Sequence, residues 1–484
     1  MKARLIFCLT FPCWVAIRSA LAISGVDAPP APAPPAETKF AQAKEAKLEN
    51  GLKVIVVERP GLPVLAAELV VRSGAEVDPK ERAGAASMTA DLLTKGTEKM
   101  SAPEIASAIE SLGGTINSGA RWDASRAGGV VMSDKAEAAL GILADVVLHP
   151  TFKPEEIDRL KTQTLDALRV DLKEPGSLAQ FVVARVIFGD GAYGHPPGGT
   201  LESIQAITRE DITELYKTHY TPRNAVLILA GNVTLEQGLK YAEKFFGDWK
   251  SDPPAGDDRP SRAATDWEPA SVIVDMPDAG QAAVIVGRPV IKRDSPDYYS
   301  ALVANAALGT GFISRLNREI RIKRGLSYGA RSSLEARREV GPFLASAQTK
   351  NQSAAEVAGL FQSEMKRLGT EPVEGGELQS RQAVLTGGFA RRLETNAGYV
   401  TQISALATYG LPLDTLDKFI PSIDAVKSSD VSAFAEKYFN TAPSLVIVGQ
   451  ASEFLEALKG TVPDLKVIPQ SELNLNRSDL AKAK

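Results

Sequence analysis

"GLKVIVVERPGLPVLAAELVV" spans residues 51–71, and "ASVIVDMPDAGQAAVIVGRPV" spans residues 270–290. Each stretch contains an apolar run, a short turn with proline, and a second apolar run. Short runs rich in Val and Ile that are bounded by turn residues indicate β-strands. Pro60 of the first turn and Pro277 of the second are 217 residues apart. The same strand–turn–strand unit therefore opens two parts of the chain.

A second pair of stretches repeats at nearly the same spacing. "ITREDITELYKTHYTPRNAVLILAG" (residues 207–231) and "VKSSDVSAFAEKYFNTAPSLVIVG" (residues 426–449) both have the pattern of a capped helix, a turn and an apolar strand that ends in glycine. Asp211 and Asp430 are 219 residues apart, and the closing glycines are 218 apart. We therefore expect an α+β fold with two homologous domains, each an antiparallel sheet with packed helices.

The N-terminus has the features of a secretory signal peptide. Lys2 and Arg4 form a positive start, residues 5–17 are mostly apolar, and Ala20-Leu21-Ala22 forms a small-x-small cleavage site. We expect cleavage after Ala22 and export to a bacterial periplasm or another exported compartment.

Composition shifts mark the remaining boundaries. A proline-rich stretch follows the signal, and a stretch rich in Pro, Asp and Ser separates the two repeats. The expected division is a signal peptide (1–22), a proline-rich segment (23–47), a first domain (48–250), a linker (251–268), a second domain (269–470) and a flexible tail (471–484).

Charge and cysteine content exclude several classes of function. The 484 residues carry a formal net charge of −4, which argues against a nucleic-acid surface. Both cysteines, Cys8 and Cys13, lie in the signal, so the mature chain has no disulfide and no cysteine-bound zinc. No later segment is apolar for long enough to predict a membrane span.

Several stretches together resemble one peptidase family. "RAGAASMTADLLTKGT" (residues 82–97) follows the first strand pair, "DVVLHPTFKPEEIDRLK" begins at Asp145, and "LGTGFISRLNREIRIKRGLSYG" begins at Leu308. Their sequence and order resemble the M16 (insulinase, pitrilysin and mitochondrial processing peptidase) family, over nearly all of both halves.

The resemblance implies a zinc site that this chain has lost. Zinc-binding members carry His-x-x-Glu-His on the first helix, where two histidines hold the metal and the glutamate acts as general base. Ser87, Ala90 and Asp91 occupy those positions here, and a further glutamate ligand would fall near Ala167. The chain has three histidines, and none forms such a pair. We expect no metal in this chain.

The stretch that begins at Leu308 also contains closely spaced cations, Arg321, Lys323 and Arg324, which could form a site or simply end a helix. Ile313, Leu316 and Ile320 recur at helical spacing, which predicts an amphipathic helix from Phe312 to Arg324, and Gly325 suits its C-terminal cap. An alternating pattern then predicts a strand from Leu326.

This helix-to-strand junction can bring Arg321 and Tyr328 together. From the residues alone, a structural role remains an alternative to a site: Arg321 would interact with the negative end of the helix dipole, and Tyr328 would be half-buried. Peptidases of the M16 family, which this chain resembles, carry an Arg and a Tyr at this spacing, facing the zinc across a chamber. The resemblance therefore implies that Arg321 and Tyr328 act in catalysis, in trans with a partner.

Gly309 and Gly311 in "LGTG" are weaker candidates. They could let a substrate strand approach the backbone closely, or they could only form a tight turn before the helix.

The resemblance implies a substrate-binding, zinc-free subunit of a heterodimeric M16 metallopeptidase. Its partner would be an M16 chain with His-x-x-Glu-His that carries the zinc, and its substrates would be unfolded peptides. Such a chain is inactive alone, so whether it counts as an enzyme stays open. The alternative is a non-enzymatic M16-like scaffold or peptide-binding protein. An independent hydrolase has no Ser-His-Asp arrangement to support it.

Overall fold

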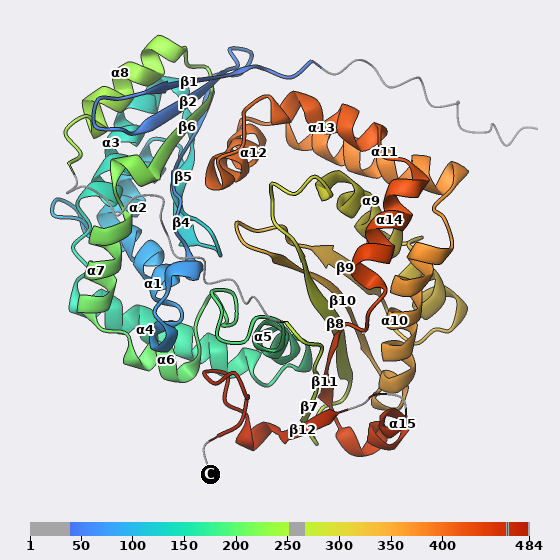
Figure 1. The fold of residues 1–484 in the computed structure, drawn as a ribbon. Helices are drawn as coiled ribbons and strands as arrows, with labels where there is room; N and C mark the ends of the chain where they lie inside the picture. Colours follow the sequence, from blue (N-terminus) through green and yellow to red (C-terminus); the bar gives the residue numbers. More distant parts are fainter. Residues whose placement is uncertain (1–38, 251–266, 461, 463, 483–484) are drawn as a thin grey trace, which may run out of the picture. The chain divides into compact units, whose positions relative to one another are not determined.

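The strands β6 (Ala225–Gly231) and β11 (Ser444–Gly449) are buried at every residue. Each lies inside a six-stranded sheet in the computed structural model, which describes residues 39–250, 267–460, 462 and 464–482 (Figure 1). A strand that is covered on both faces is expected to be apolar throughout, without alternation. The two continuous apolar runs of the sequence are therefore the central strands of two sheets.

The first sheet has the strand order β1-β2-β6-β3-β5-β4. Its other strands are β1 (Ala43–Lys47), β2 (Lys53–Glu58), β3 (Val64–Val71), β4 (Thr115–Ala120) and β5 (Ser125–Met132). The helices of this half are α1 (Ala85–Leu92), α2 (Ala102–Ser111), α3 (Ala136–Leu148), α4 (Pro154–Asp171), α5 (Pro175–Phe188), α6 (Leu201–Ala206), α7 (Arg209–His219) and α8 (Leu235–Phe246).

The second sheet has the order β12-β7-β11-β8-β10-β9, so its inner strands repeat the first sheet's arrangement. Its other strands are β7 (Ser271–Asp275), β8 (Ala282–Ile291), β9 (Ala330–Leu334), β10 (Gly341–Thr349) and β12 (Leu465–Pro469). The helices are α9 (Tyr298–Gly309), α10 (Ala354–Thr370), α11 (Gly375–Arg392), α12 (Asn396–Tyr409), α13 (Thr415–Asp424), α14 (Ser428–Phe439) and α15 (Leu455–Lys459). The duplicated α+β fold is confirmed.

Each sheet is mixed, where the sequence predicted antiparallel sheets. β6 inserts between β2 and β3, running parallel to β2 and antiparallel to β3. β11 does the same between β7 and β8, and β12 adds a second parallel pair at the edge. The chain between β2 and β6 includes three strands and several helices, which makes it long enough for β6 to return parallel to β2.

The residues of β6 alternate between two hydrophobic cores. Leu227 and Leu229 pack with helices of the first half, whereas Val226 and Ile228 face the opposite side of the sheet. β11 alternates in the same way. Each sheet is therefore enclosed between two helical layers.

The second layer of each sheet comes from the other half of the chain. α12 covers the first sheet, with Tyr399, Val400 and Ile403 in the core with Val226 and Ile228 (Figure 1). α5 covers the second sheet, where Leu178, Ala179 and Val182 pack against residues of β7, β8 and β11. The two halves thus complete each other's cores, and residues 40–484 form one compact unit.

The C-terminal segment, which we expected to be a flexible tail, packs against this unit. Leu475 and Leu480 are buried in the core that contains α5. The guanidinium of Arg185 donates to the backbone oxygen of Leu475 at 2.9 Å. The sequence did not predict this because the two apolar residues are isolated among polar ones. The expected signal peptide, residues 23–38 of the proline-rich segment and most of the linker lie outside the described residues. Residues 43–47 of the expected proline-rich segment form β1.

No helix in the described ranges is both long and apolar enough to cross a membrane.

Asp123 joins the two halves through a buried carboxylate. It lies between β4 and β5 and is 2% exposed. Its side chain accepts hydrogen bonds from the Tyr193 hydroxyl at 2.6 Å and from the Arg338 backbone N–H at 3.2 Å. Burial and the neighbouring carboxylate raise the pKa of Tyr193, which keeps its hydroxyl protonated as a donor. Asp123 thus links α5's C-terminal loop to the β9–β10 connection.

We predict that Asp123→Ala destabilises the protein. It leaves buried donors of Tyr193 and Arg338 without an acceptor, which should lower the free energy of unfolding by about 2–3 kcal/mol. Urea denaturation measures this, with Asp166→Ala as control, because Asp166 pairs with Arg169 on an exposed surface of α4. Equal stability of the two variants would contradict a structural role for Asp123.

Candidate functional site

Arg321 lies on a π-helix, Asn317–Lys323. We expected an amphipathic helix from Phe312, but helical structure begins at Arg315. Leu316 and Ile320 are fully buried, in agreement with the prediction. π-Helical segments are uncommon and occur frequently at functional sites.

The expected start of the helix was wrong because a turn precedes it. Gly311 has φ +83°, a left-handed conformation that is incompatible with a right-handed helix. Phe312 and Ile313 follow in this turn and are 57% and 52% exposed, so Ile313 does not contribute to the helix's buried face.

The π-helix ends with a reversal at Gly325, in agreement with the prediction. Gly325 has φ +64°, and its N–H donates to the Arg321 carbonyl at 3.1 Å. The N–H of Leu326 donates to the Ile320 carbonyl at 2.9 Å. These bonds satisfy the last carbonyls of the helix and turn the chain back along it.

The strand predicted from Leu326 begins only at Ala330, as β9. Between Leu326 and Ala330, side chains make the hydrogen bonds to β10 that the backbone of a strand would make. Ser327 Oγ donates to the Gln348 carbonyl, and Thr349 Oγ1 donates to the Leu326 carbonyl, both at 2.6 Å. This segment is therefore hydrogen-bonded to β10 without being a strand, and Tyr328 projects from it into solvent. Tyr328 is 89% exposed, which does not fit the alternative of a half-buried tyrosine.

The reversal brings Arg321 and Tyr328 into contact. Arg321 Cζ lies 4.6 Å from the centroid of the Tyr328 ring and 4.7 Å from that of Phe312. The cation is thus held by two aromatic rings. Sequence reasoning missed Phe312, which we assigned to the helix.

Asn317 fixes this arrangement at its base. Its side-chain amide donates to the Gly311 carbonyl at 3.0 Å, and its side-chain oxygen accepts the Ala330 N–H at 2.9 Å. A single buried side chain therefore connects the turn, the π-helix and the first residue of β9.

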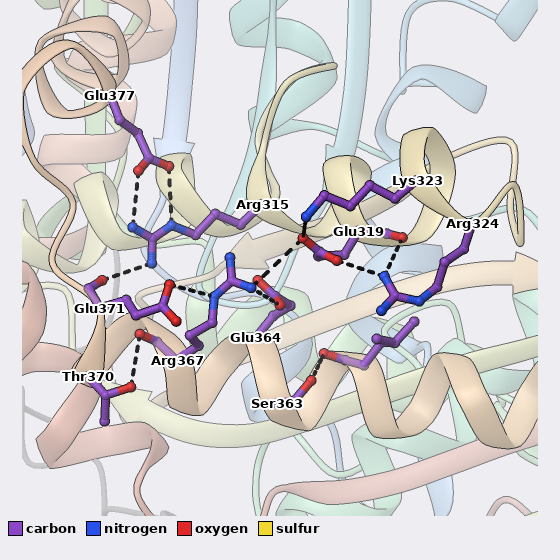
Figure 2. Close-up of polar contacts among 11 residues, drawn as sticks. Arg315, Glu319, Lys323, Arg324, Ser363, Glu364, Arg367, Thr370, Glu371 and Glu377 are labelled. Carbon is purple, nitrogen blue, oxygen red and sulfur yellow. Dashed lines mark hydrogen bonds and ion pairs between the residues drawn. The ribbon is translucent and has the colours of Figure 1, made fainter.

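Glu319 neutralises the other cations at the end of the helix. Its buried carboxylate accepts hydrogen bonds from Lys323 and Arg324 (Figure 2). Those hydrogen bonds lower the pKa of Glu319 despite its burial. The four-residue spacing of Glu319 and Lys323 was a signal for this pair.

The network extends to the neighbouring helices. Arg367 of α10 pairs with Glu364 and Glu371, and Arg315 pairs with Glu377 of α11 (Figure 2). In the described part of the chain, the Arg321 guanidinium forms no ion pair and donates no hydrogen bond; its contacts are with aromatic rings. Of the cations that follow Glu319 on this helix, Arg321 keeps its donors available.

The two glycine candidates have different roles. A Cβ on Gly309 would lie 2.1 Å from the backbone nitrogen of Ser332, so this glycine allows α9 to pack closely on β9. Gly311 has open space around it and is required by its positive φ. The structure accounts for both by conformation and packing.

A groove of about 920 Å³ lies beside Tyr328. Its lining includes both candidate glycines, the exposed Arg331 of β9, Gln348 of β10 and Gln180 of α5. The mixture of amide, cationic and backbone groups suits a polar, extended ligand.

The positions of the lost zinc motif lie on α1, with Ala167 on α4. Ala90 is fully buried, and Ser87 Oγ donates to the Pro197 carbonyl at 2.8 Å. No cluster of three or more His, Cys, Asp or Glu side chains suited to a metal occurs within residues 39–250, 267–460, 462 and 464–482. Asp91 is the one carboxylate among the four expected positions, so these residues do not fit a zinc ion.

Asp91 is partly buried beside Gly119 of β4. Burial raises the pKa of Asp91 to about 6, and the nearby Lys95 offsets part of this effect.

Two family models match successive parts of the chain. Residues 53–186 match insulinase (peptidase family M16), and residues 206–385 match the peptidase M16 inactive domain. The chain belongs to the M16 family. Together with the residues on α1, the inactive-domain match favours a non-catalytic type of M16 member.

The relatives cover nearly the whole chain. A Streptomyces coelicolor protein named as an uncharacterized zinc protease is 26% identical over 85% of this chain and 91% of its own length. YmxG of Bacillus subtilis, also named as an uncharacterized zinc protease, is 22% identical over 83% of this chain and 96% of its own length.

Solved structures have the same fold. A peptidase M16 inactive domain from Pseudomonas fluorescens has a TM-score of 0.77 and 27% identity, covering 84% of this chain and 98% of that one. A protease from Helicobacter pylori has a TM-score of 0.78 at 20% identity over 84% of this chain and all of that one.

We predict that the purified M16 chain binds no stoichiometric zinc. Ser87, Ala90, Asp91 and Ala167 provide too few ligands for a tetrahedral site. Elemental analysis after incubation with zinc and dialysis measures this. About one firmly held zinc ion per chain would contradict the prediction.

We predict that Asp91→Asn stabilises the protein at neutral pH. Because folding raises the pKa of Asp91 from 3.8 to about 6, the native state favours the protonated form, and stability is lost as pH rises through this range. The variant should gain about 1–2 kcal/mol of unfolding free energy near pH 8 and nothing near pH 4. Urea denaturation at both pH values tests this, and an equal effect at both would contradict it.

Proposed function

We propose that this chain is the substrate-binding, zinc-free subunit of a heterodimeric M16 metallopeptidase. Arg321 and Tyr328 would act in the active site of a partner M16 chain that carries His-x-x-Glu-His and the zinc. The chain alone would not cleave peptides.

One observation carries this proposal: the contact between Arg321 and an almost fully exposed Tyr328. A tyrosine that serves packing is buried over most of its ring, but this one is displayed at a fixed reversal. The arginine beside it keeps its donors, while Lys323 and Arg324 are neutralised by Glu319. A scaffold has no evident need for this arrangement.

The two groups suit peptide hydrolysis. Attack on a peptide bond places negative charge on the carbonyl oxygen, and preorganised donors stabilise that charge strongly once water is excluded. The Tyr328 hydroxyl offers one donor, and the Arg321 guanidinium adds positive charge and further donors.

The proposed substrates are unfolded peptides, and the proposed location is the periplasm or another exported compartment. The groove beside Tyr328 has both polar and apolar surface and has space for an extended chain. The signal-like N-terminus supports export. We propose neither a nucleic-acid ligand nor a membrane span.

We predict that Tyr328→Phe lowers the turnover of the reconstituted complex. The change keeps the ring against Arg321 and removes one hydroxyl donor. Loss of an oxyanion donor costs about 2–4 kcal/mol of activation free energy, or roughly a hundredfold or more in rate. The measurement is kcat and KM on an unstructured peptide, with the zinc-bearing partner present and absent. Arg321→Ala should also lower activity.

Matched variants separate chemistry from folding. Tyr241→Phe removes a hydroxyl from α8, and Arg318→Ala removes an exposed cation from the same π-helix as Arg321. Both should leave the rate unchanged, and thermal melts should show every variant folded. Unchanged kinetic constants for Tyr328→Phe in an active complex would favour the scaffold alternative.

A further inference from the structure

Phe312 is a large apolar residue that is 57% exposed. The turn that carries it is fixed on both sides. The Gly311 carbonyl accepts from Asn317, and the Ile313 carbonyl accepts from the Arg381 guanidinium at 2.9 Å. The position of Phe312 is therefore set by its neighbours and not by burial of its own ring.

Exposed apolar residues concentrate in this segment. Among the residues that the structure describes, nine large hydrophobic side chains are exposed, and four of them lie between positions 312 and 328: Phe312, Ile313, Ile322 and Tyr328. Single exposed hydrophobics are ordinary, but two exposed aromatic rings on one guanidinium, those of Phe312 and Tyr328 on Arg321, indicate a functional surface.

Within this group, Phe312 and Tyr328 are the two whose rings contact the Arg321 guanidinium, at 4.7 and 4.6 Å from Cζ. Ile313 is nearly as exposed as Phe312 but has no ring to interact with a cation. A free arginine side chain on a surface has many rotamers, and ordering them on binding opposes affinity. Two rings that hold the guanidinium reduce that cost before the ligand arrives.

We infer that Phe312 is a positioning residue of the peptide site: it acts through Arg321, holding the guanidinium ready for the oxygen acceptors of a bound peptide. The inference rests on the proposed function. It adds a residue that neither the zinc motif nor the spacing of Arg321 and Tyr328 indicates. The ligand groups are carbonyl or carboxylate oxygens, which a guanidinium binds through its N–H donors.

Binding of a short, fluorescein-labelled, unstructured peptide to the full-length mature chain tests this by fluorescence anisotropy. A cation–π contact at an exposed site is worth enough to change Kd about two- to fivefold, so Phe312→Ala should weaken binding by that factor. Phe312→Trp should restore it, because tryptophan offers the strongest face for a cation. Ile313→Ala, the matched control in the same turn, should leave Kd unchanged.

A double-mutant cycle identifies the route of the effect. If Phe312 acts through Arg321, Phe312→Ala should have no further effect in the Arg321→Ala background. An equal effect in both backgrounds would overturn the inference, because Phe312 would then contact the peptide independently. Unchanged Kd for Phe312→Ala would overturn it too.

In the assembled complex, Phe312→Ala should raise KM more than it lowers kcat, and a fall in kcat alone would contradict a role in ground-state positioning.

The same experiment distinguishes failure of the inference from failure of the proposed function. If the wild-type chain binds the peptide and Arg321→Ala weakens binding while Phe312→Ala does not, only the role of Phe312 is lost. If the wild-type chain binds no peptide, both fail. A peptide with an amidated C-terminus and no acidic residue separates the acceptors: retained binding assigns them to main-chain carbonyls, and lost binding assigns them to carboxylates.

Discussion

Coverage of both faces of each sheet is the constraint on which the rest of the structure depends. β6 and β11 are apolar at nearly every position, so each sheet needs helices on two sides. Each half supplies one layer for itself and one for the other, through α12 and α5. The interface between the halves is therefore hydrophobic core, and the site on the second half rests on a sheet that the first half helps to enclose.

The local chemistry of the site follows from how charge is distributed on one short helix. The helix carries several cations, and its one buried carboxylate, Glu319, accepts from two of them. Arg321 is held by aromatic rings, which fix a guanidinium without neutralising it. The result is a positive group that is ordered and still able to donate, which is the property that an anionic transition state requires.

Patterns local in sequence predicted much of this. The duplicated strands, the cap at Gly325 and the missing zinc ligands were all readable from residue type and spacing. The features that differed depend on distant groups. The parallel pairing of β6 with β2 is set by a long connection, and the exposure of Tyr328 is set by bonds from its flanking residues to β10. The role of Phe312 follows from the turn at Gly311, which helical spacing does not reveal.

The exchange of helices between the halves also governs how the chain acquires its structure. During synthesis α5 emerges with an apolar face long before β11, which follows it by more than two hundred residues, exists to receive it. The face of the first sheet that α12 covers likewise stays uncovered until α12 has been synthesised. Contacts between such distant segments slow folding and leave apolar surface exposed in partly made chains. Neither half covers both faces of its own sheet, so the first sheet is complete only after the second half has been made.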